Sequence, residues 1–178
     1  MQMSRYWYSV QNPFFAAGYG LPNCTCYAFG RCWEINNYYG YGNTAPRLPT
    51  GNAEDWYNTV SGYEKGQTPK LGAIICFANP QGYGVGHVAV VEEIHGNGEI
   101  VTSNSAWGGQ YFFLSTLNPD GQGKYHWDGG GGVQYTSQGF IYNKYAEGGS
   151  PTPTPTASGG KFPWVLYSRR LRQRNTNY

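Results

Sequence analysis

The feature that most constrains this chain is the change of hydrophobic pattern at Gly72. Before it, residues 24–37 place apolar side chains at helical spacing, and Asn23 is a suitable N-cap. After it, short apolar runs at 73–78 and 86–93 are bounded by glycine, proline or a turn, as in buried strands. Helices first and strands after them predict an α+β domain, with N-terminal helices packed on an antiparallel β-sheet.

Weaker signals complete the expected order of elements. Residues 1–22 contain several glycines and prolines and are expected to be irregular. A short helix is predicted over 53–60, and Gly96-Asn97-Gly98 is a predicted hairpin turn. The remaining predicted strands cover 99–103, 111–114 and 139–142, the last two separated by a Gly-rich segment, 121–132.

The chain of 178 residues is long enough for one domain with a real core and a tail. We expect a first domain over 1–145 and a Pro/Thr/Gly linker over 146–160. Residues 161–178 are too few to fold alone and are expected to begin a second, truncated module, with a basic appendage as the alternative. The first ten residues lack the apolar region of a signal peptide, and no run approaches membrane-spanning length.

Composition excludes some partners and favours others. A net charge of +2 is too small to indicate a nucleic-acid partner. Aromatic residues make up 17% of the chain and glycines number 27, which is typical of strand-rich domains that bind sugars or extended polymers. Cysteines stand at 24, 26, 32 and 76, without paired Cys-x-x-Cys motifs, so we expect reduced thiols, no metal site and no cofactor.

Cys24 is the candidate nucleophile. It lies in the first turn of the predicted helix, where unpaired backbone N–H groups and the helix dipole favour a thiolate. A thiolate at such a position is a common way to activate a cysteine in enzymes. The alternative is that Cys24 is simply a small buried side chain, as free cysteines often are.

A cysteine nucleophile needs a base and a group that orients the base. Of the three histidines, His87 begins a buried strand directly after a glycine, whereas His95 and His126 lie in a turn and a loop. In the predicted hairpin, His87 faces residue 106 or 107, so Asn104 is the expected orienting residue and Glu99 lies too near the turn.

Four segments in order carry a resemblance to a known family. They are Asn-Cys-Thr-x-Tyr-Ala-x-Gly-Arg at 23–31, Pro-Lys-Leu-Gly-Ala-Ile at 69–74, Gly-His-Val-Ala-Val-Val at 86–91 and Ser-Asn-Ser-Ala-Trp-Gly-Gly at 103–109. The chain resembles the CHAP family, the cysteine, histidine-dependent amidohydrolases/peptidases, over roughly residues 5–145. The resemblance implies a papain-like α+β fold and cleavage of amide bonds in bacterial peptidoglycan.

The resemblance also implies roles for individual residues. Cys24, and not Cys26, matches the family nucleophile, His87 the base and Asn104 the orienting residue. A second polar residue that some members carry is replaced here by Ala106. Some members bind calcium ahead of the cysteine, but residues 1–23 contain no acid, so no such site is expected.

Further residues are expected to meet the substrate. The Cys24 backbone N–H and the Asn23 side chain would meet the oxyanion. Tyr19 and Trp107 are candidates for walling a groove, together with Tyr27 and Trp127, and core packing is the alternative for each of these aromatic residues.

The predicted function is therefore that of a peptidoglycan hydrolase acting as endopeptidase or N-acetylmuramoyl-L-alanine amidase. The chain resembles a phage endolysin in carrying a linker and in having no predicted signal peptide. This resemblance implies a protein that is made in the host cytoplasm and released through a holin-type pore. A monomer is expected. A non-catalytic cell-wall- or carbohydrate-binding module is the main alternative. A zinc enzyme and a cysteine peptidase or transferase acting on proteins are the others.

Overall fold

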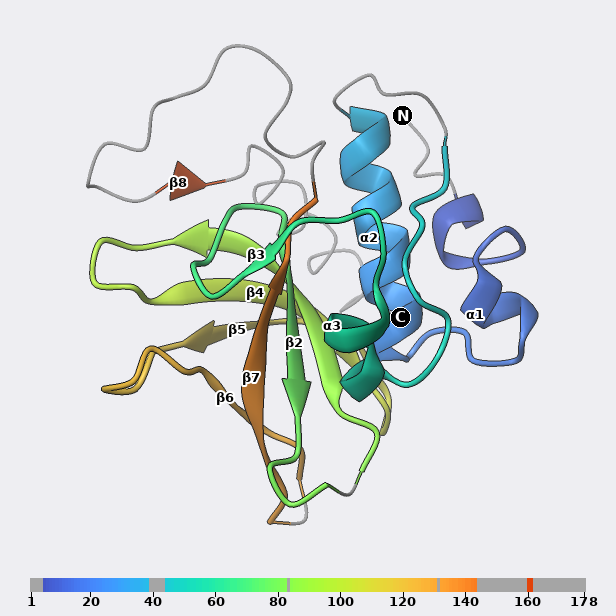
Figure 1. Cartoon of the computed structure of the whole chain (residues 1–178). Coiled ribbons are helices and arrows are strands. Elements are labelled where there is room, and N and C mark those ends of the chain that lie inside the picture. Colours follow the sequence, from blue (N-terminus) through green and yellow to red (C-terminus); the bar gives the residue numbers. More distant parts are fainter. Residues whose placement is uncertain (1–4, 39–43, 83, 131, 144–159, 162–178) are drawn as a thin grey trace, which may run out of the picture.

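The computed structural model describes residues 5–38, 44–82, 84–130, 132–143 and 160–161. These residues form an α+β domain in which helices precede an antiparallel sheet, which confirms the predicted fold class (Figure 1). The helical elements are η1 (Arg5–Tyr8), α1 (Pro13–Ala16), α2 (Cys24–Tyr38), η2 (Ala53–Asp55) and α3 (Trp56–Thr59). The strands are β1 (Lys65–Gly66), β2 (Ile74–Ala78), β3 (His87–Ile94), β4 (Ile100–Ala106), β5 (Gln110–Leu117), β6 (His126–Asp128), β7 (Gln134–Ile141) and β8 (Gly160–Lys161).

The sheet has the strand order β1-β7-β2-β3-β4-β5, while β6 pairs with β7 and β8 pairs with β3. The central strands β2 and β3 are buried along almost their whole length, as their continuous apolar sequence predicts. Register shifts occur within β3 between Val91 and Glu93 and within β4 between Asn104 and Ala106. The second of these lies next to the residues of the candidate site.

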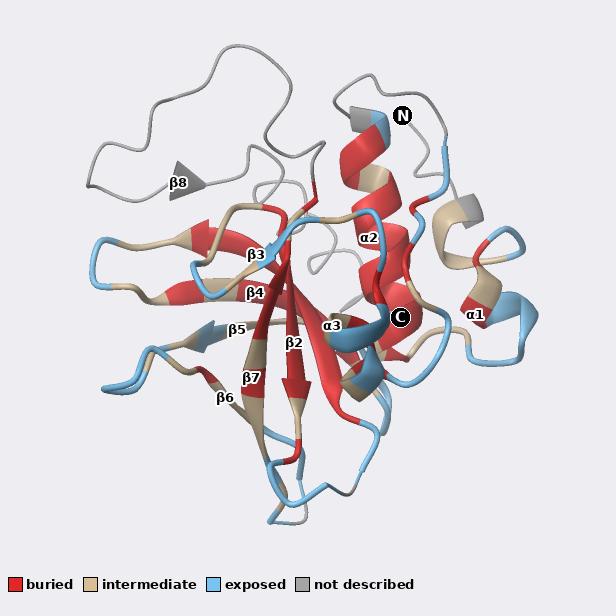
Figure 2. Cartoon of the chain, viewed as in Figure 1, coloured by how far each residue is buried: buried red, intermediate tan, exposed pale blue. Residues whose placement is uncertain are grey.

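Helix α2 covers one face of the sheet, and Figure 2 shows that both the helix and the strands beside it are buried. Phe29, Cys32 and Ile35 of α2 belong to the same hydrophobic cluster as Val88 and Val90 of β3. Burying these side chains provides the main attraction between helix and sheet. The N-terminal end of α2 is thereby held against the strand that begins with His87.

A second hydrophobic cluster fills the opposite face of the sheet. Side chains alternate between the two faces along a strand, so Ile75 and Phe77 of β2 belong to this cluster, whereas Ile74 and Cys76 contact the α2 side. Tyr125, just before β6, is buried here as well. The site residues on β3 and β4 lie at the border of this second cluster.

Several predicted elements differ from the structure. Residues 1–22 are not wholly irregular, because they include η1 and the one-turn α1, which Asn12 caps through a hydrogen bond from Phe14 N. The helix predicted over 53–60 is split into η2 and α3, and Asn52 makes no side-chain cap bond. His126, predicted to lie in a loop of the Gly-rich segment 121–132, is instead the first residue of β6. Residues 146–159 of the linker predicted over 146–160, and residues 162–178, lie outside the described residues, whereas 160–161 form β8.

Candidate active site

His87 and Asn104 form a hydrogen-bonded pair. His87 is the first residue of β3 and Asn104 lies near the end of the neighbouring strand β4. The imidazole Nε2 and the amide Oδ1 are 3.0 Å apart, and both side chains are buried. The structure therefore brings together the predicted base and orienting residue.

Thr102 determines which atom of Asn104 faces the imidazole. Asn104 Nδ2 donates to the backbone oxygen and to Oγ1 of Thr102, each at 3.0 Å. Because the amide nitrogen is engaged there, Oδ1 faces His87 and accepts a hydrogen bond from Nε2–H. This network assigns the tautomer with Nε2 protonated, and it leaves Nδ1 as the basic nitrogen of the ring.

Cys24 begins α2 and reaches the first residues of β3. The residue is half-buried, and its sulfur accepts hydrogen bonds from backbone N–H groups, including that of Val88. Val88 directly follows His87, so the Cys24 sulfur lies against the first residues of the strand that begins with the base. The structure thus brings all three predicted catalytic residues to one end of the helix–sheet interface.

The expected low pKa of the cysteine is wrong for the resting protein. Burial raises the pKa of the Cys24 thiol, and the hydrogen bonds from backbone N–H groups offset that rise only in part. Burial also lowers the pKa of His87 to about 4, against a smaller opposite effect of the Asn104 hydrogen bond. Both pKa shifts favour a neutral thiol beside a neutral imidazole, because a buried site disfavours charge.

Asn23 caps helix α2, as predicted. Its Oδ1 accepts from Thr25 Oγ1 at 2.6 Å and from Cys26 N at 2.9 Å. Its backbone N–H donates to Ser105 Oγ at 3.0 Å, which joins the start of the helix to β4. With Oδ1 held by the cap, Nδ2 of Asn23 has no acceptor among the described residues and is available to a ligand.

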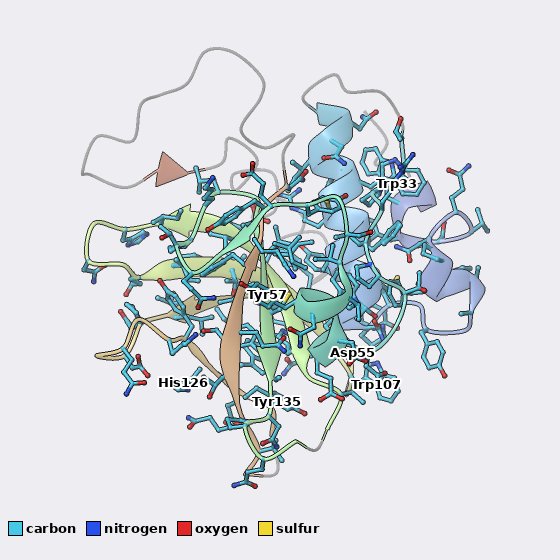
Figure 3. The ribbon with its side chains drawn as sticks, viewed as in Figure 1. Trp33, Asp55, Tyr57, Trp107, His126 and Tyr135 are labelled. Atoms are coloured by element: carbon cyan, nitrogen blue, oxygen red, sulfur yellow. The ribbon has the colours of Figure 1, made fainter. Side chains whose placement is uncertain are left out.

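The predicted aromatic residues divide into two groups. Tyr19 and Trp107 are exposed, at 54% and 71%, on the loops that precede α2 and follow β4; Figure 3 shows Trp107 near the end of the molecule where α2 starts. Tyr27 is buried and stacks on Tyr8, so it belongs to the core. Trp127 stacks on His87, a contact that the sequence did not predict because a Gly-rich segment gives no register for its tryptophan.

The other titratable candidates lie outside this site. His95 contacts Glu93 and Glu99, and His126 pairs with Asp120 at 3.0 Å. The remaining cysteines are free and buried. Within the described part of the chain, no group of three potential metal ligands gathers, and no helix has the length and apolar character needed to cross a bilayer.

Comparison with known proteins identifies the family. The model of the CHAP domain matches residues 14–106, which include Cys24, His87 and Asn104. The chain therefore belongs to the CHAP domain family.

Curated relatives come from Staphylococcus aureus. The staphylococcal secretory antigen SsaA is 37% identical over 86 residues, covering 46% of this chain and 31% of the relative. The probable autolysin LDP is 35% identical over 114 residues, covering 61% of this chain and 36% of the relative. The chain thus spans about a third of the length of these relatives.

A solved structure is also similar. It is an N-acetylmuramoyl-L-alanine amidase from Staphylococcus aureus, with 30% sequence identity and a TM-score of 0.45. The match covers 55% of this chain and 27% of the amidase.

Proposed function

We propose that this chain is a cysteine-dependent peptidoglycan hydrolase that cleaves amide bonds of the bacterial cell wall. The observation that carries the proposal is the His87–Asn104 pair at 3.0 Å, with the Cys24 sulfur hydrogen-bonded to Val88 N–H beside it. A nucleophile, a base and an orienting group in reach of one another define an acyl-transfer site. The family and the autolysin relative support peptidoglycan as the substrate.

The reaction starts from the neutral pair. His87 Nδ1 takes the proton from the Cys24 thiol as the sulfur attacks the scissile carbonyl carbon. The tetrahedral intermediate collapses when the imidazolium returns that proton to the leaving amine, which breaks the C–N bond and leaves a thioester. Water, deprotonated by the same imidazole, then attacks the thioester, which releases the carboxylic acid and the Cys24 thiol.

Two donors are positioned for the oxyanion. The Cys24 backbone N–H lies in the first turn of α2, where the first bond within the helix is from Tyr27 N to Asn23 O. Asn23 Nδ2 is oriented away from the cap that its own oxygen forms. Such a donor contributes about 3 kcal/mol to lowering the barrier in well-studied acyl-transfer enzymes.

Clearing of Gram-positive cell walls tests the proposal. Wild-type protein should reduce wall turbidity, and Cys24→Ala should abolish the effect because it removes the proposed nucleophile. Cys26→Ala is the matched control, since it removes a buried thiol two residues away on the same helix. Equal clearing by wild type and Cys24→Ala would contradict the cysteine mechanism. Wall binding without clearing by either protein would favour the non-catalytic binding module.

Mass spectrometry of the released fragments separates the two candidate bonds. New amino termini on stem or cross-bridge peptides would identify an endopeptidase. Freed lactyl groups on muramic acid, with intact stem peptides, would identify an N-acetylmuramoyl-L-alanine amidase. Size-exclusion chromatography with light scattering checks the expected monomer.

We extend the proposal to a phage lysin released through a holin-type pore. The Pro/Thr/Gly stretch over 146–160 and the apolar and basic run after it support a lytic domain joined to a second module. Expression in a Gram-positive host with and without a co-expressed holin tests this. Lysis only with the holin supports release through its pore, and lysis without it contradicts that route.

A further inference from the structure

We infer that Trp127 is a positioning residue for His87, holding the imidazole by a face-to-face stack and stabilising its protonated form during the reaction. The inference rests on the proposed function, because it concerns the base of that reaction. Trp127 lies beyond the residues 14–106 that the family model matches. The site is therefore completed by a residue from outside that match.

The geometry is that of a parallel stack. The ring centroids of His87 and Trp127 are 4.0 Å apart and the ring planes differ by 8°. The indole thus fixes the plane of the imidazole, while Asn104 holds Nε2 within that plane at 3.0 Å. These two contacts together leave the ring a single orientation in which Nδ1 is the free nitrogen.

The neighbouring side chains hold Trp127 in place. Phe113 of β5 lies 5.8 Å from its ring centroid and Phe77 of β2 lies 6.3 Å away. On β7, Tyr135 is its cross-strand partner, and Figure 3 shows this residue and His126 of β6. The short strand β6 is thereby fixed on two sides, and its one tryptophan covers the face of the base.

The stack favours the imidazolium that the reaction requires. Tryptophan has the strongest electrostatic attraction for a cation above its ring face, and 4.0 Å is well within the effective range. Among the described residues, the side chain that hydrogen-bonds the imidazole is the neutral amide of Asn104 and not a carboxylate. The indole face therefore supplies the stabilisation that a carboxylate would provide in a different site.

The titratable groups around His87 are few. The elements packed near it are α2, β2, β4 and β6, with η2 adjoining Gly86. Among the described residues of these elements, Cys24 is the titratable side chain beside the base. The other titratable side chains considered lie farther away: Cys76, Glu54, Asp55, His126 and Asp128. Cys24 is the partner with which His87 exchanges a proton, so its reactivity reports on the imidazolium.

Alkylation of Cys24 by iodoacetamide as a function of pH tests the inference without any cell-wall substrate. Trp127→Leu keeps an apolar side chain but removes the ring face, and Trp127→Phe keeps a weaker one. At pH 6–7 the Leu variant should react about 2- to 30-fold more slowly than wild type, with Phe in between. Near pH 10 the rates should converge, because thiolate then forms without the imidazolium. Phe140→Leu is the matched control, because it removes a buried ring of the same hydrophobic cluster whose ring partner is Tyr125.

Peptide mapping by mass spectrometry distinguishes this effect from unfolding. If Trp127→Leu unfolds, the buried Cys26, Cys32 and Cys76 become alkylated too, and the Phe variant then decides the question. Equal Cys24 alkylation rates at neutral pH in wild type and a folded Leu or Phe variant would overturn the inference.

On soluble wall fragments, kcat of the Trp127 variants should fall with KM nearly unchanged. Failure of wild type to clear walls, with the alkylation difference intact, would contradict only the proposed function.

Discussion

Ser105 Oγ accepts a 3.0 Å hydrogen bond from the backbone N–H of Asn23, which joins the residue that caps α2 to the residue that follows Asn104. The same hydroxyl donates to Gln110 O on β5 at 3.2 Å. Through this one side chain, the start of the helix that carries Cys24 is tied to the strand that carries the orienting amide. The hydroxyl thereby links the element of the nucleophile to the strand whose Asn104 hydrogen-bonds the base.

Ser105→Ala should therefore weaken both the fold and the activity. It leaves the buried N–H of Asn23 without its acceptor, which costs about 1–3 kcal/mol. Because the start of α2 is released, kcat should fall about tenfold or more, as expected when reacting groups move by a fraction of an ångström. Urea unfolding and wall-clearing rates measure the two effects, with the exposed Ser61→Ala as control. A stable variant with normal activity would show that the link is dispensable.

The free energy of unfolding should depend on pH through His87. Its pKa is about 4 in the folded protein and near 6.5 when unfolded, so the unfolded chain binds the extra proton first. Stability from this group is complete above pH 6.5 and is lost as pH falls toward 4, by about 3 kcal/mol in total. His87→Gln should flatten the wild-type curve in that window. Parallel curves for wild type and His87→Gln would contradict the lowered pKa.

Much of the candidate site could be predicted from sequence because local rules determine it. An N-cap residue before a helical pattern places Cys24 in the first turn, and a glycine-centred turn fixes how β3 and β4 pair. His87 and Asn104 then meet without any information from distant parts of the chain.

Two properties of the site depend on tertiary packing and could not be read from sequence. Trp127 comes from a three-residue strand inside a Gly-rich segment. Such a strand is too short to show an alternating hydrophobic pattern, so the sequence does not identify it. The pKa of Cys24 depends on how deeply the first turn of α2 is covered, which its position in the helix does not reveal.

Gly86 permits η2 to approach the start of β3. A Cβ atom at this position would lie 2.5 Å from Phe77 O and 2.6 Å from Glu54 N, and the backbone φ is +71°. Backbone strain alone costs about 1–3 kcal/mol at such a position. Gly86→Ala should destabilise the protein by more than this, and should displace His87. Gly82→Ala is the matched control, because its φ is +75° but nothing lies within 4 Å of the added methyl group. Similar losses of stability for both variants would show that the close approach has no separate cost.

A buried ionic network holds α2 against β3 farther along the same interface. Arg31 Nε and Nη2 donate to the two carboxylate oxygens of Glu92 at 2.8 and 2.9 Å, and Nη1 donates to Glu34 at 2.6 Å. Ser103 Oγ also donates to Glu92, at 2.7 Å. The arginine lies two turns after Cys24 and the glutamate five residues after His87, so the network also fixes how the two catalytic elements sit against each other.

Arg31→Met should be strongly destabilising, by about 3–5 kcal/mol, because the Glu92 carboxylate remains buried without the arginine that neutralises it. Adding Glu92→Leu should recover part of that loss, since the double variant no longer buries that negative charge. Urea unfolding of the single and double variants measures the coupling, and Arg47→Met, at an exposed arginine, should stay within about 0.5 kcal/mol of wild type. If the losses of unfolding free energy in the single variants simply added up in the double variant, the coupling would be contradicted. A double variant that is stable but slow in wall clearing would show that the network positions α2 against β3 as well as stabilising the fold.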